Sequence, residues 1–86
     1  MYDILLTKEA RAFYDKADGP LAKRLNRCFE HLRREPHQHP NIKRLHGPLT
    51  GCYRYRVGDW RVVYRVDEHG AVVIILIIVH RSKAYE

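Results

Sequence analysis

"CYRYRVGDWRVVYR", residues 52–65, alternates arginines with aromatic and aliphatic side chains and is interrupted once by Gly58-Asp59. Such alternation is typical of β-strands, whose successive side chains point to opposite faces of a sheet. With Gly58-Asp59 as a two-residue hairpin turn, Arg56 lies directly opposite Arg61. One face then collects Tyr53, Tyr55, Val57, Trp60, Val62, Tyr64 and Val66. The other face collects Cys52, Arg54, Arg56, Arg61, Val63 and Arg65.

The segments around this hairpin predict an α+β fold with the order β-α-α-β-β-β. A short apolar run at residues 4–6 indicates a first strand, and Thr7 can cap the helix that follows it. Apolar residues at helical spacing predict a first helix that ends at Asp18-Gly19-Pro20. A second amphipathic helix begins there, with Pro20 in its first turn, and ends at Pro36. The later strands are expected at residues 52–57, 60–66 and 71–79, and residues 36–51 are expected to form a loop.

The strand at residues 71–79 is apolar on both faces, so we expect it inside the sheet. The first strand is the element left to cover its free edge. The predicted architecture is therefore an antiparallel four-stranded sheet of order 1-4-3-2, with a helical hairpin packed on one face. We expect residues 1–86 to form one domain, because a chain of this length has room for a single core. Cys28 and Cys52 have no metal or redox spacing, so we interpret them as reduced residues of a cytoplasmic protein. The longest apolar run, residues 71–79, is too short to span a membrane.

The chain is basic, with 16 Lys and Arg against 10 Asp and Glu and a formal charge of +6. This balance favours a polyanionic partner, with nucleic acid first and an acidic protein segment second. Arginines facing each other across two strands cost roughly 0.2–1 kcal/mol, so folding does not explain them. An anionic ligand would explain them, since the guanidinium group binds phosphate in two-point contacts. The alternative is a solvated face that discourages aggregation.

The end of the chain, "VHRSKAYE" at residues 79–86, carries groups that can move protons. Histidine changes charge near neutral pH, so His80 can carry a proton in either direction, and Tyr85 can donate one or stack on a base. In the alternative interpretation, His80 is a packing residue and Tyr85 pins the tail to the domain. The isolated His37-Gln38-His39 does not predict a metal site. Basic residues of the loop extend the charged surface or are simply solvated: Lys43, Arg44 and His46.

Two stretches, "KRLHGPLTGCYRYRVGDWRVVYRV" and "VVIILIIVHRSKAY", resemble the RelE branch of the RelE/ParE toxin superfamily. The resemblance implies a metal- and cofactor-independent endoribonuclease that cuts mRNA in the ribosomal A site. It also implies a cognate RelB-like antitoxin, with operator DNA as a partner of the toxin–antitoxin complex. We expect catalytic roles for Arg56, Arg61, His80, Arg81 and Tyr85. We expect contacts with RNA phosphates from Arg54, Arg65, Lys43, Arg44 and His46.

One departure from the family leaves the general base open. Some members carry lysines where this chain has Arg54 and Arg56, and arginine stays protonated at physiological pH. The role can pass to His80, to ribosomal groups or to solvent. Two other functions remain as alternatives: a ParE-like toxin that inhibits DNA gyrase without cutting RNA, and a nucleic-acid-binding module without activity.

Overall fold

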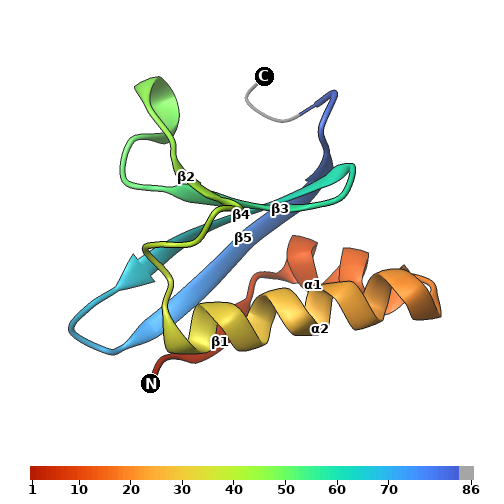
Figure 1. Cartoon of the computed structure of the whole chain (residues 1–86), viewed down its shortest axis with the longest axis horizontal. Helices are drawn as coiled ribbons and strands as arrows, with labels where there is room; N and C mark the ends of the chain where they lie inside the picture. Colours follow the sequence, from red (N-terminus) through yellow and green to blue (C-terminus); the bar gives the residue numbers. More distant parts are fainter. Residues whose placement is uncertain (84–86) are drawn as a thin grey trace.

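The computed structural model describes residues 1–83. The strands form one sheet in the order β1-β5-β4-β3-β2, and Figure 1 shows both helices on one side of it. The α+β class and the helical layer are therefore as predicted. Neither α1 nor α2 has the length and apolar composition that a membrane-spanning helix requires. The elements are β1 (Asp3–Leu6), α1 (Lys8–Lys16), α2 (Gly19–Arg34), β2 (Ile42–Arg44), η1 (Gly47–Leu49), β3 (Tyr53–Val57), β4 (Trp60–Asp67) and β5 (Val72–His80).

The sheet differs from the prediction in two details. It has a fifth strand, because β2 pairs antiparallel with β3 inside the segment that was expected to be a loop. This strand has three residues, two of them charged, so no run of alternating apolar residues marks it. The second difference is direction: β1 runs parallel to β5, which makes the sheet mixed and not antiparallel throughout. The order of the other four strands is the predicted one.

Each helix begins at a short polar side chain whose oxygen can accept a hydrogen bond from an unpaired backbone N–H group of the first turn. Thr7 Oγ1 accepts from the N–H of Ala10 at 3.2 Å, as predicted, and Asp18 Oδ1 accepts from the N–H of Leu21 at 2.9 Å. The Thr7 hydroxyl also donates to the carbonyl of Leu76 at 2.6 Å, across to β5. Thr7 thus fixes the start of α1 against β5.

Leu76 is the extra residue of a bulge between β4 and β5. Val63 pairs with Ile77 and the next residue, Tyr64, pairs with Ile75, so the register shifts by one at Leu76. The shift changes the spacing of the β5 side chains that face the helices. These side chains are Val73, Ile75 and Ile78, spaced by two and then by three residues.

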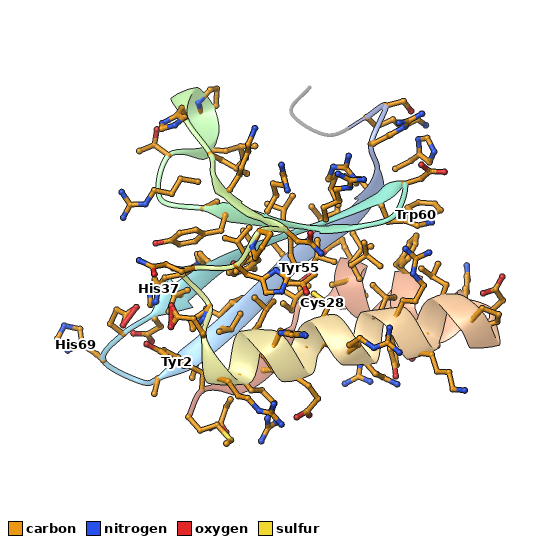
Figure 2. All side chains as sticks on the ribbon, in the orientation of Figure 1. Tyr2, Cys28, His37, Tyr55, Trp60 and His69 are labelled. Atoms are coloured by element: carbon orange, nitrogen blue, oxygen red, sulfur yellow. The ribbon has the colours of Figure 1, made fainter. Side chains whose placement is uncertain are left out.

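The core lies between the sheet and the helices, and Figure 2 shows Tyr55 and Cys28 in this layer. The predicted division of side chains is confirmed, because the apolar set from the hairpin lies in or against the core between the sheet and the helices. The Tyr64 hydroxyl, fully buried, donates to the carbonyl of Pro36 at 2.7 Å. Cys28 and Cys52 are both free. The buried members of the core are Ala10, Leu25, Cys28, Leu32, Tyr55, Val57, Val62, Tyr64, Val73, Ile75 and Ile78.

Candidate functional site

The open face is the side of the sheet opposite the helices, and β3 and β4 supply its arginines. They are Arg54, Arg56, Arg61 and Arg65. The register is the predicted one, with Arg56 opposite Arg61 across the hairpin. Figure 1 shows η1 (green) and the end of β5 (blue) rising from the sheet on this same side. The open face is therefore bordered by two segments that are far apart in the sequence.

Arg61 is held in place by the hairpin turn itself. Its Nη1 donates to the carbonyl of Gly58 at 2.9 Å and to the carbonyl of Trp60 at 3.0 Å. An arginine has five N–H donors, so those on Nε and Nη2 remain for a ligand. A guanidinium group fixed in this way loses little freedom when it binds a phosphate, which makes it suited to stabilise charge that develops there.

The residues after β5 return to the same turn. The backbone N–H of Arg81 donates to the carbonyl of Asp59 at 2.8 Å, and Arg81 Nε lies 3.8 Å from Asp59 Oδ1. This ion pair is exposed, so it contributes little to stability, but it places a second guanidinium group beside the turn that holds Arg61. Two of the predicted catalytic residues, separated by 20 positions, are thus anchored to adjacent residues of one turn.

His80 lies at the border of this site and not on the open face. It pairs with Trp60 across β4 and β5, and the two rings meet edge to face with centroids 5.3 Å apart. Trp60 also meets Phe13 of α1, with centroids 4.9 Å apart, so it belongs to the helix side of the sheet. His80 shares that side, whereas Arg61 points to the other.

Ser82 makes two contacts with the ring of His80, both at Nδ1. The backbone N–H of Ser82 donates to His80 Nδ1 at 3.2 Å, and Ser82 Oγ lies 2.9 Å from the same atom. The backbone bond favours the neutral ring that carries its proton on Nε2. The hydroxyl can also accept from an N–H at Nδ1, because it rotates and serves as donor or acceptor. In that tautomer Nε2 is free to accept a proton.

A second group of predicted RNA-binding residues surrounds a cleft between β2, β3 and η1. The cleft has a volume of about 440 Å³ and an apolar wall made by Leu45, Pro48 and Leu49. Arg54 is fixed by a 2.7 Å bond from its Nη1 to the carbonyl of Asn41. The structure therefore brings together the basic residues that line this cleft, Lys43, Arg44, His46 and Arg54.

Other predicted residues lie apart from these two groups. Arg65 pairs with Ile74 and is four positions along β4 from Arg61, or about 13 Å at the usual rise of a strand. Arg56 lines a different cleft, next to α2, together with Arg24 and Arg27. Tyr85 lies outside the described residues.

Arg24 and Arg27 were not predicted as site residues, because an amphipathic helix ordinarily carries basic residues on its solvated face. The available signal was their spacing of three, which places both on the same side of α2.

Comparison of this chain with known proteins identifies its family. The family model described as the ParE toxin of the type II toxin-antitoxin system matches residues 4–85. The chain belongs to the RelE/ParE superfamily of type II toxins. A curated member of this superfamily, the toxin RelG of Mycobacterium tuberculosis, is 35% identical over 85 residues, which cover 98% of this chain and 95% of RelG.

Solved structures of RelE/ParE toxins agree with this assignment. The toxin of a RelBE toxin–antitoxin complex from Mycobacterium tuberculosis is 32% identical, with a TM-score of 0.78 over 93% of this chain and 98% of that one. The match in the archaeal RelE–RelB complex from Pyrococcus horikoshii is 27% identical, with a TM-score of 0.81 over 96% and 98% of the two chains. The isolated RelE toxin of E. coli, 19% identical with a TM-score of 0.80, covers 99% of this chain and 89% of its own and shares the fold.

Proposed function

We propose that this RelE/ParE toxin is a ribosome-dependent endoribonuclease that cuts mRNA in the A site of the ribosome. The observation that carries the proposal is the pair of guanidinium groups, Arg61 and Arg81, anchored to neighbouring residues of one turn. Arg61 is fixed by hydrogen bonds that leave donors available. Arg81 is held beside the same turn by its backbone bond and by an exposed ion pair with Asp59. The protein would act in the cytoplasm, where its substrate is translated.

The chemistry follows from what two fixed cations can do for a phosphodiester. The 2′-oxygen of one nucleotide attacks its own phosphorus, and the bond from phosphorus to the 5′-oxygen of the next nucleotide breaks. Negative charge builds on the non-bridging oxygens, where Arg61 and Arg81 would stabilise it. A base takes the 2′-hydroxyl proton and an acid protonates the departing 5′-oxygen. The products are a 2′,3′-cyclic phosphate and a 5′-hydroxyl, and the step needs no metal.

His80 is our candidate for one of the proton transfers. It lies at the end of β5 next to Arg81, and Ser82 supports both of its neutral tautomers. Tyr85, on the tail, is the candidate for the other transfer. Arg54, Lys43, Arg44 and His46 would bind the RNA beyond the cut, since they line one cleft at the far border of the open face. Arg56 and Arg65 would add contacts to neighbouring phosphates.

The test is to express the chain in bacteria and map 5′ ends of mRNA while growth is followed. We expect growth arrest and new ends inside codons. Arg61→Ala and Arg81→Ala should abolish both effects, and Tyr85→Ala should weaken them. Arg34→Ala, at the end of α2, removes an exposed arginine on the helix side as a control. Equal cleavage by the Arg61→Ala and Arg81→Ala variants and the wild type would rule out this site.

A second candidate function is inhibition of DNA gyrase, and the match to the ParE toxin family model is the observation that favours it. A gyrase inhibitor would have no need for proton-transfer groups near the arginines. Supercoiling assays with purified gyrase separate the two functions. Lost supercoiling with intact mRNA would support the ParE-like activity.

We also propose a RelB-like antitoxin as partner, because the Mycobacterium and Pyrococcus relatives were solved as toxin–antitoxin complexes. Leu5 and Ile77 are 57% and 41% exposed, which leaves apolar surface for a partner to cover, and the charge of +6 would attract an acidic segment. Such a complex is also expected to bind operator DNA. Co-expression with the neighbouring reading frame should restore growth and yield a stable complex; harmless expression of the free chain would argue against toxicity.

A further inference from the structure

A polar cleft separates the middle of α2 from the end of β3, on the helix side of the sheet. It has a volume of about 380 Å³, within the range of about 300–1,000 Å³ common for ligand sites. Helix α2 supplies two arginines to its lining, and β3 supplies a third. We call it the α2 cleft; its lining residues are Arg24, Arg27, Cys28, Asn41, Tyr55, Arg56, Val57 and Gly58.

The three arginines of the α2 cleft have no carboxylate partner among residues 1–83. In that part of the chain arginine forms ion pairs elsewhere, at Arg33 with Glu30 and at Arg81 with Asp59. Like charges three or four positions apart on a helix are unfavourable, so Arg24 and Arg27 weaken α2 slightly. Packing does not require a third arginine beside them. The two unpaired guanidinium groups of α2, with a third unpaired arginine on the strand beside them, indicate an anionic ligand.

The α2 cleft and the open face meet at the hairpin turn. The Arg24 guanidinium group lies so close to Gly58 that a Cβ atom on this residue would be 2.5 Å from Nη2. The carbonyl of the same Gly58 accepts the bond from Arg61 at 2.9 Å. One glycine therefore separates an arginine of the cleft from the central arginine of the proposed catalytic site. A strand that binds Arg61 and continues around the turn would reach Arg24.

We propose that the α2 cleft binds a backbone phosphate of RNA, separate from the phosphate at Arg61 and Arg81. Arg24 and Arg27 would hold the phosphate oxygens with paired N–H donors, and Asn41 would supply a further donor from the other wall. The ligand class rests on the proposed function. The site itself rests on the cleft and its unpaired charges. The strand is either the substrate or ribosomal RNA, which present the same chemistry.

The test measures binding of the purified chain in two arms across a range of salt concentrations. One arm uses a fluorescent ten-nucleotide RNA with 2′-O-methyl groups, which cannot be cut, and the other uses purified ribosomes. The test variant is Arg24→Gln with Arg27→Gln. The matched control is Lys23→Gln with Arg34→Gln, which removes two exposed charges from the same helix outside the cleft. Thermal unfolding checks that both variants are folded.

We expect the cleft variant to bind about tenfold more weakly than the matched control, because charge-assisted hydrogen bonds are lost. For a single strand, the slope of log K against log salt should also fall by about 0.7 for one lost phosphate. A difference in both arms assigns the phosphate to the substrate strand, and a difference with ribosomes alone assigns it to ribosomal RNA.

Equal affinities and slopes for the cleft variant and the control in both arms would overturn the proposal. Weaker binding of the antitoxin with unchanged RNA binding would also overturn it and would assign the cleft to an acidic peptide. Because this experiment measures binding and not cleavage, it can contradict the phosphate site without contradicting the proposed nuclease activity, and the reverse. If the wild-type chain cuts no RNA but the cleft variant still binds more weakly than the matched control, the phosphate site stands and only the nuclease activity is contradicted.

Discussion

The guanidinium group of Arg61 is joined to the carbonyl of Gly58 by a 2.9 Å hydrogen bond, so the central cation of the open face is fixed to the turn between its own strand and β3. A second bond, to the carbonyl of Trp60 at 3.0 Å, uses the same nitrogen. The remaining donors of Arg61 are therefore oriented before any ligand arrives. Preorganisation of this kind is effective when charge develops during a reaction.

Replacing Arg61 should remove catalysis and leave the fold intact. Its bonds to the turn are to exposed or half-buried backbone, so Arg61→Ala should change the free energy of unfolding little. Loss of one preorganised donor to a transition state typically costs about 10²–10³-fold in rate, and we expect that loss in single-turnover cleavage on programmed ribosomes. Arg34→Ala serves as the control. An unfolded Arg61→Ala protein, or one of normal activity, would contradict the assigned role.

Gly58 is constrained both by its backbone and by its neighbour. Its φ of 58° lies in the left-handed region, and an added methyl group would meet the Arg24 guanidinium group. Gly58→Ala should therefore lower the free energy of unfolding by about 1–2 kcal/mol. Gly19→Ala is the matched control, because a Cβ there meets nothing within 4 Å, and it should stabilise the protein by about 0.4–1 kcal/mol. Urea unfolding measures both, and equal effects would contradict the prediction.

The hydroxyl of Ser82 should matter if His80 accepts a proton at Nε2. Without the hydroxyl, the backbone N–H of Ser82 favours the tautomer whose Nε2 is already protonated. We expect His80→Ala to slow cleavage by about 10²-fold, as for other general bases. Ser82→Ala should slow it less, and Ser82→Thr should restore the rate because it keeps the hydroxyl.

The pH dependence of cleavage distinguishes this role from a purely structural one. His80→Ala should remove one limb of the pH–rate profile, because the group that transfers the proton is lost. His69→Ala is the control, since Figure 2 shows His69 at the opposite end of the sheet from Trp60, the ring that contacts His80. A profile unchanged by His80→Ala would exclude proton transfer by this residue.

The stability of the protein should fall in alkaline solution. Burial raises the pKa of the Cys28 thiol above its ordinary value of 9.0 and that of the Tyr64 hydroxyl above 10.0. Above pH 9 the unfolded chain releases the thiol proton while the folded chain retains it. The free energy of unfolding should therefore decline as the pH rises above about 9, approaching about 1.4 kcal/mol per pH unit for one group.

Cys28→Ala should remove the part of this decline that begins near pH 9 and leave the part that begins near pH 10, where Tyr64 contributes. Urea unfolding from pH 7 to 10.5 measures both proteins. The cavity left by the smaller side chain lowers stability at every pH, so the comparison concerns the slope only. Parallel curves between pH 9 and 10 would show that the Cys28 thiol is not the group responsible.

Most of the fold and part of the site were predictable because they depend on local periodicity. The alternation at residues 52–65 identified the register of the hairpin and the face of every arginine on it, since a turn of two residues leaves one pairing. The helix cap at Thr7 and the break before α2 were likewise predictable, because each depends on neighbouring residues in the chain. Strand β2 was missed because three residues, two of them charged, carry no alternation.

The amino-acid sequence by itself determined the helices, the hairpin, the interior position of β5 in the sheet and the basic character of the open face. These properties follow from side-chain spacing along the chain. Tertiary structure alone decided that β1 runs parallel to β5, that Arg81 returns to Asp59, that His80 shares a side with Trp60, and that Arg24 lies against Gly58. Each of these relationships joins residues at least 20 positions apart, and spacing along a chain carries no information about which distant groups packing will bring together.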